Sequence, residues 1–78
     1  MNDQVETIKE EMKVDMVADM AVMLMERTPG LTMEQALDTV FNSDTYRKMM
    51  DDRMQLYYQS PGYVFSFLDT ELKTGKMG

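Results

Sequence analysis

Apolar side chains recur at three- and four-residue steps between Val5 and Met25, which is the spacing of a helix face. Pro29 disfavours helix in the residue before it and Gly30 accepts turn geometry, so we expect this helix to end near Thr28. The pattern predicts one helix over about residues 3–27, which at 1.5 Å per residue is roughly 37 Å long. A small domain is only about 30 Å across, so part of the helix is expected to project.

Two apolar stripes run along this predicted helix, whereas an ordinary surface helix carries one. The first stripe contains Val5, Ile8, Met12, Met16, Met20 and Met23. The second, roughly opposite, contains Val14, Val17, Ala18, Ala21 and Met25. Either the helix is central and buries both stripes, or one stripe faces the core and the other faces a partner. A partner on the second stripe would contact Val14, Ala18 and Ala21, and a partner on the first would contact Met12 and Met16.

Three shorter helices are expected over about residues 32–42, 44–55 and 61–73. Thr32 and Gln35 have the spacing of a capping box, and Ser43 or Asp44 is expected to cap the next helix. A short extended stretch over residues 54–59 is an alternative to the end of that helix. The sequence therefore predicts an all-α fold in a single domain over residues 1–78.

The last predicted helix begins at Ser60-Pro61, since serine is a good cap and proline is tolerated at the first helical position. Its expected buried face consists of Tyr63, Val64, Phe67, Leu68 and Leu72. Phe65 lies on a different face of the helix, so we expect Phe67 rather than Phe65 to anchor the core.

All the aromatic residues lie between Phe41 and Phe67, and they are densest around Pro61. Tyr57 and Tyr58 are adjacent, so their side chains diverge and one of them is expected to be exposed. Tyrosine is enriched in binding hot spots. We therefore expect Tyr57, Tyr58 and Pro61 to form a partner-binding turn, with Tyr58 as its anchor; the alternative is that the turn is scaffold.

Composition narrows the possible functions. Cysteine and histidine are absent, which removes the usual ligands of zinc and haem and the common nucleophile pairs, and no phosphate-binding glycine pattern occurs. We therefore predict no enzyme activity, no catalytic residue, no cofactor and no metal. The chain has eight basic residues against fourteen acidic ones, so we predict no binding of nucleic acid.

The cellular location of the protein and the kind of surface that it binds are also predicted from its composition. No run of about twenty apolar residues or basic leader is present, so we predict no membrane contact and a cytoplasmic location. The net charge of −6 favours a basic protein partner. Eleven methionines are typical of an adaptable interaction surface, although they also serve as gap fillers in a small core.

A series of positions in residues 36–75 follows a recognisable pattern: Ala36-Leu37, Asn42-Ser43, Tyr46, Leu56-Tyr57, Gln59-Ser60-Pro61, Tyr63-Val64, Phe67, Glu71 and Thr74-Gly75. In this it resembles a family of small bacterial proteins of unknown function that accompany toxin-type enzymes. The resemblance covers about half the chain and implies an antitoxin-like or accessory role. The methionine-rich first helix departs from the pattern.

The sequence thus predicts a non-enzymatic domain that binds another protein and forms a homodimer. The alternative is a structural homodimer subunit of unknown role.

Overall fold

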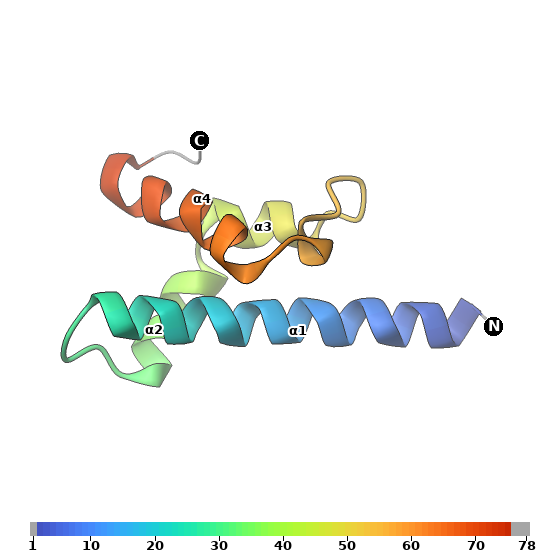
Figure 1. Cartoon of the computed structure of the whole chain (residues 1–78), viewed down its shortest axis with the longest axis horizontal. Helices are drawn as coiled ribbons and strands as arrows, with labels where there is room; N and C mark the ends of the chain where they lie inside the picture. Colours follow the sequence, from blue (N-terminus) through green and yellow to red (C-terminus); the bar gives the residue numbers. More distant parts are fainter. Residues whose placement is uncertain (1, 76–78) are drawn as a thin grey trace.

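The computed structural model describes residues 2–75, with side chains from Gln4 onward, and is all-α as predicted (Figure 1). Its elements are α1 (Asn2–Arg27), α2 (Met33–Phe41), α3 (Asp44–Met50), the 3₁₀ helix η1 (Leu56–Tyr58) and α4 (Pro61–Thr74). No strand occurs within this range.

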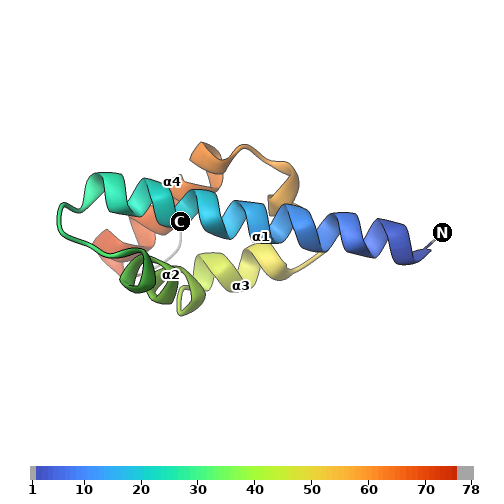
Figure 2. The same ribbon diagram turned by 90° about the horizontal axis from the view of Figure 1, so that it is seen from below.

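The long helix α1 organises the fold. It contacts every other element, and the molecule is elongated along it, with extents of 43 × 24 × 19 Å. Figure 2 shows α2 and α3 along one side of α1, with α4 crossing behind it. The N-terminal end of α1 extends beyond the other helices, as its predicted length required (Figure 1).

The core takes one continuous face of α1. That face combines neighbouring members of the two predicted stripes: Met16 and Met20 from the first, and Val17 and Ala21 from the second. The core face is therefore centred between the stripes, because successive residues of a helix point about 100° apart. The assignment of Ala21 to a partner surface is wrong, since its exposed fraction is 0%. Met16 is buried as well, and Met12 is partly buried. The first stripe therefore exposes little apolar surface to a partner at these two positions.

Local capping fixes the ends of the short helices as expected. Thr32 and Gln35 form the complete capping box of α2. Of the two candidates for the cap of α3, the structure uses Ser43, whose Oγ accepts from the Tyr46 amide at 3.0 Å. Ser60 caps α4 in the same way, with Pro61 in the first turn.

Helix α3 ends at Met50, five residues before the predicted end. The cause is Asp51, whose carboxylate accepts hydrogen bonds from both the backbone amide and the guanidinium of Arg53. This tight turn competes with helix continuation. The side-chain hydrogen bond from Arg53 also lowers the pKa of Asp51 to about 2. Gln55 then adopts a left-handed conformation with φ of 52°, and η1 follows in place of the alternative extended stretch.

The phase of α4 differs from the prediction. Val64, Phe65 and Leu68 are buried, Phe67 is only partly buried, and Tyr63 and Leu72 are largely exposed. Phe65 is directed against the end of α1, where the guanidinium carbon of Arg27 lies 5.2 Å from its ring centroid. Phe67 instead packs at the edge of the core and makes an edge contact with the exposed Tyr63.

Glu71 of α4 fastens α3 to the core. Its carboxylate accepts from the backbone amides of Asp44 and Thr45 at 2.8 and 2.9 Å, and from the Thr45 hydroxyl at 2.8 Å. These are the orphan amides of a helix N-terminus, where a negative charge is favoured. Glu71 thereby sets the position of α3 from a point 26 residues away in the chain.

Candidate partner-binding groove

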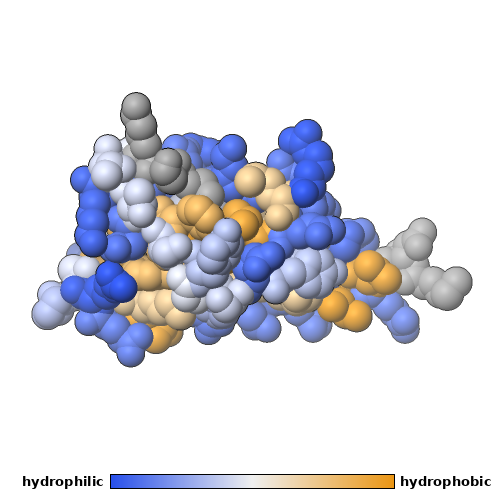
Figure 3. Space-filling model, turned by 45° about the horizontal axis from the view of Figure 1, so that its top comes forward, coloured by the Kyte–Doolittle hydropathy of each residue, from blue (hydrophilic) through white to orange (hydrophobic). Residues whose placement is uncertain are grey.

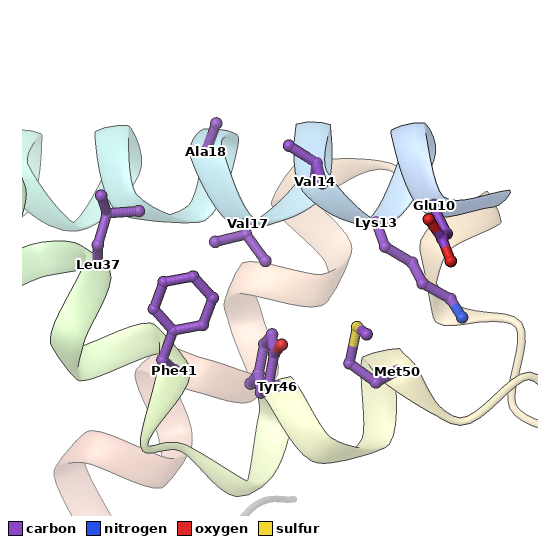
Figure 4. Close-up of a pocket in the computed structure, with 9 residues that line it drawn as sticks. All are labelled: Glu10, Lys13, Val14, Val17, Ala18, Leu37, Phe41, Tyr46 and Met50. Atoms are coloured by element: carbon purple, nitrogen blue, oxygen red, sulfur yellow. The ribbon is translucent and has the colours of Figure 1, made fainter. Parts of the chain in front are cut away.

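An open apolar groove runs between α1 on one side and α2 and α3 on the other (Figure 4). Its volume is about 390 Å³. It is lined by Glu10, Lys13, Val14, Val17, Ala18, Leu37, Phe41, Tyr46 and Met50. We refer to this feature as the groove.

Large apolar side chains of the groove remain in contact with solvent. Val14 is 66% exposed and Phe41 is 50% exposed, and Ala18 and Met50 are exposed as well. Phe41 is the last residue of α2, and the corner at Asn42 and Ser43 turns the chain into α3 just beyond it. The corner brings Phe41 and Tyr46 into an edge-to-face contact, with ring centroids 5.2 Å apart. The two rings belong to the wall that faces α1, and they lie across from Val17 (Figure 4).

The two charged residues that line the groove, Glu10 and Lys13, lie at one end of it. Lys13 donates to the Asp52 carboxylate at 2.7 Å, and this hydrogen bond raises the pKa of Lys13. Its ammonium group also lies 5.1 Å from the ring centroid of Tyr57, so Lys13 connects this end of the groove to η1. Glu10 lines the same end and forms no ion pair among the described residues.

The opposite end of the groove is acidic. A second hollow adjoins it and shares Leu37 and Phe41. The other residues that line this hollow are Thr32, Glu34, Gln35 and Asp38. Glu34 is exposed and, within residues 4–75, has no ion-pair partner. Carboxylates therefore lie at both ends of an apolar surface.

The structure separates the predicted partner-binding residues into different environments. Val14 and Ala18 lie together in the groove, and Ala21 is in the core. In the aromatic turn, Tyr57 is buried with 3% exposed, Pro61 is half-buried, and Tyr58 is 56% exposed. The ring of Tyr58 lies against that of Tyr57, with centroids 4.7 Å apart and planes tilted by 38°, so the prediction that the two side chains diverge is wrong. The prediction that one of the two tyrosines is exposed is confirmed for Tyr58, but Tyr63, expected in the core, is also exposed.

The opposite wall of the groove was missed in the sequence. Leu37, Phe41, Tyr46 and Met50, which form this wall, were not among the predicted partner-binding residues. The two pairs follow a common pattern, since Leu37 and Phe41, like Tyr46 and Met50, are spaced by four residues. Each pair lies on a helix of less than three turns, which is too short to cover the whole length of α1.

The polar chemistry of the groove is limited. Its polar side-chain groups are the phenol of Tyr46, the carboxylate of Glu10 and the ammonium of Lys13, which is bound to Asp52. Across the described residues, no group of three or more acidic side chains is placed to hold a metal ion. The arrangement suits the binding of an apolar surface.

Comparison of the chain with protein-family models, with curated proteins and with solved structures gives no significant match. Among residues 2–75, no helix combines the length and the apolar character that crossing a membrane requires. Fold and groove together define a small acidic all-α domain with an open apolar surface between three helices.

Replacing Tyr58 tests the aromatic turn. We expect Tyr58→Ala to lower stability by no more than about 1 kcal/mol, because Tyr58 is exposed and loses its ring contact with Tyr57. Loss of a rigid aromatic contact should weaken partner capture by about tenfold, or roughly 1.4 kcal/mol. Thermal melts and capture assays on the same samples check both outcomes. Unchanged capture would show that the turn is scaffold.

Proposed function

We propose that this chain is a non-enzymatic, cytoplasmic protein-binding domain, and that its partner occupies the groove. The observation that carries the proposal is the exposure of Val14 and Phe41 within one apolar concavity. Contiguous exposed apolar surface on a small soluble domain typically marks an interaction site.

The openness of the groove favours a protein over a small ligand. Small-molecule sites bury most of the ligand's surface, whereas Val14 and Phe41 remain exposed to solvent in this groove. Glu10 and Lys13 lie at one end, and Val14 and Val17 on one wall and Phe41 on the facing wall are apolar. A helix in a groove is recognised mainly through such apolar contacts.

The resemblance of residues 36–75 suggests the identity of the partner. It implies a toxin-type enzyme, in which case this domain acts as an antitoxin-like or regulatory partner in a bacterial cell. Co-expression with a neighbouring toxin gene would show this as restored growth. The groove variant described next should fail to restore growth.

A double substitution tests the role of the groove. We expect Val14→Gln with Ala18→Gln to reduce partner capture from the source lysate by about a hundredfold, which corresponds to about 2.8 kcal/mol. Both positions are exposed, and glutamine is a good helix former, so stability should change little. Binding should be quantified with the captured protein once it has been identified by mass spectrometry and purified.

Val22→Gln is the matched control. Val22 is an exposed valine of the same helix that lines neither the groove nor the adjoining hollow. Capture should survive this change. Equal capture by wild type, the double variant and the control would contradict the proposal.

A second candidate function is a homodimer subunit. The observation that favours it is the projecting end of α1, where Val5 is 50% and Ile8 is 54% exposed. Figure 3 shows hydrophobic surface at this end of the molecule. A monomer at micromolar concentration in sedimentation experiments would exclude this candidate, and a dimer that Val5→Gln with Ile8→Gln dissociates would support it.

A further inference from the structure

We infer that the occupant of the groove is an amphipathic α-helix of a partner protein, with basic residues flanking its apolar stripe. This inference rests on the proposed function and specifies the chemistry of the partner. It follows from the length of the groove, the contents of its walls and the sign of the charges at its ends.

The length fits about two turns of helix. On α1 the groove extends from Glu10 to Ala18, a rise of about 12 Å at 1.5 Å per residue. The facing wall comes from α2 and α3, with Leu37 and Phe41 followed by Tyr46 and Met50 (Figure 4). A helix that presents apolar residues at positions i, i+3, i+4 and i+7 covers this length with one stripe.

The charges favour a cationic partner. Glu10 at one end and Glu34 at the other have no ion-pair partner within the described part of the chain, and Asp38 lies beside Glu34 in the adjoining hollow. Lys13 is the one cation that lines either concavity, and it is bound to Asp52. Lysine or arginine at the two ends of a docked helix would therefore meet unpaired carboxylates.

A second copy of this chain fits less well. Its exposed apolar segment, Val5 and Ile8, is flanked by Glu6, Glu10 and Glu11, and its one lysine, Lys9, is paired with Glu6 at 3.7 Å. Docking that segment would place these acids against Glu10 or Glu34 of the first copy, and each copy has a net charge of −6. Like-charge juxtaposition opposes such an interface.

Three synthetic peptides test the inference. The first is an amphipathic helix with a leucine stripe and lysines on its other faces. The second replaces every lysine with glutamate. The third keeps the composition of the first but distributes the leucines evenly around the helix. Each is labelled with a fluorophore, and its affinity for the full chain is measured by anisotropy.

We expect the leucine–lysine peptide to bind, and the other two to bind at least tenfold more weakly. Val14→Gln with Ala18→Gln should weaken the leucine–lysine peptide by tenfold or more without changing any charge, and Val22→Gln should have no effect. Glu10→Gln with Glu34→Gln should weaken it about fivefold at low salt, and this difference should shrink as salt screens the charges.

The charge control is Asp19→Gln with Glu26→Gln. These two acids also lie exposed on the chain and line neither concavity, and their removal changes the net charge by the same amount. Unchanged affinity in this variant would assign the effect to the groove rather than to overall charge.

Several outcomes would overturn the inference. Equal binding of the glutamate peptide would overturn the basic partner, and equal binding of the scrambled peptide would overturn the amphipathic helix. A dimer that the Val14 and Ala18 substitutions dissociate would make a second copy the occupant. Each of these results is compatible with a groove that binds a partner. The proposed function itself would fail in a different experiment, in which the Val14 and Ala18 double variant captures the native partner as well as the wild type does.

Discussion

Phe65→Ala is expected to remove most of the stability of the protein. The Phe65 side chain is 4% exposed and packs with Val64 and Leu68 in the core, beneath the guanidinium of Arg27. Removing a buried phenylalanine ring costs about 3–5 kcal/mol. A small domain holds only about 5 kcal/mol or somewhat more in all. Chemical denaturation followed by circular dichroism should show a midpoint close to zero denaturant.

Phe67→Ala is the matched control for this prediction. Phe67 has the same side chain on the same helix but is only partly buried at the edge of the core, and its ring makes an edge contact with exposed Tyr63 at 5.1 Å. We expect a loss of about 1–2 kcal/mol from the aromatic pair and the partial burial. Equal losses for the two variants, or a larger loss for Phe67→Ala, would contradict the observed phase of α4.

Glu71→Ala is expected to have the second-largest effect, a loss of about 3 kcal/mol in the free energy of unfolding. Hydrogen bonds to charged groups contribute about 1.5–3 kcal/mol each, and their contributions are not additive. The substitution leaves the amides of Asp44 and Thr45 and the buried Thr45 hydroxyl without their acceptor. Because α3 carries Tyr46 and Met50, the same change should also weaken partner capture. Glu71→Gln should recover part of the stability, since its amide oxygen can still accept hydrogen bonds.

Asp69→Ala is the control that distinguishes the hydrogen bonds of Glu71 to α3 from the effect of an ordinary surface carboxylate. Asp69 is two residues earlier on α4 and forms ion pairs with Arg27 at 3.3 Å and Lys73 at 3.0 Å. Partly exposed ion pairs of this kind contribute about 0–1 kcal/mol. Denaturation midpoints of the Glu71 and Asp69 variants should therefore differ clearly. If both substitutions cost the same, Glu71 is a surface charge and does not hold α3.

The helices were predictable because their boundaries are local. Thr32 with Gln35, and Ser60 with Pro61, specify helix starts through contacts between residues at most three apart. The early end of α3 is also local, but it depends on Asp51 accepting from Arg53, and aspartate followed two residues later by arginine is not by itself a stop signal.

The packing phase was not predictable in the same way. Phe65 and Phe67 are equally apolar and lie on different faces of α4, and the end of α1 decides which one is buried. The same limit applies to α1. Its two stripes predicted either a central helix that buries both or one stripe left for a partner. Val14 and Ala18 are exposed, but the core is centred between the stripes and takes Ala21.

The groove itself required the fold. Its α1 wall was expected from the second stripe, while its other wall arises only where the corner at Ser43 directs Phe41 and Tyr46 toward each other. Glu71 then determines the position of α3, and this contact joins residues 26 apart. The spacing of apolar residues predicts neither the contact between Phe41 and Tyr46 nor the contact between Glu71 and α3.

Methyl-resolved nuclear magnetic resonance tests the central claim most directly. The protein would be labelled on its valine, leucine and methionine methyl groups and titrated with the unlabelled leucine–lysine peptide. The groove predicts saturable shifts for Val14, Leu37 and Met50, with Val22 and Leu72 unchanged, because these two exposed residues line neither concavity. Saturable binding that shifts Val22 or Leu72 and leaves Val14, Leu37 and Met50 in place would contradict the claim.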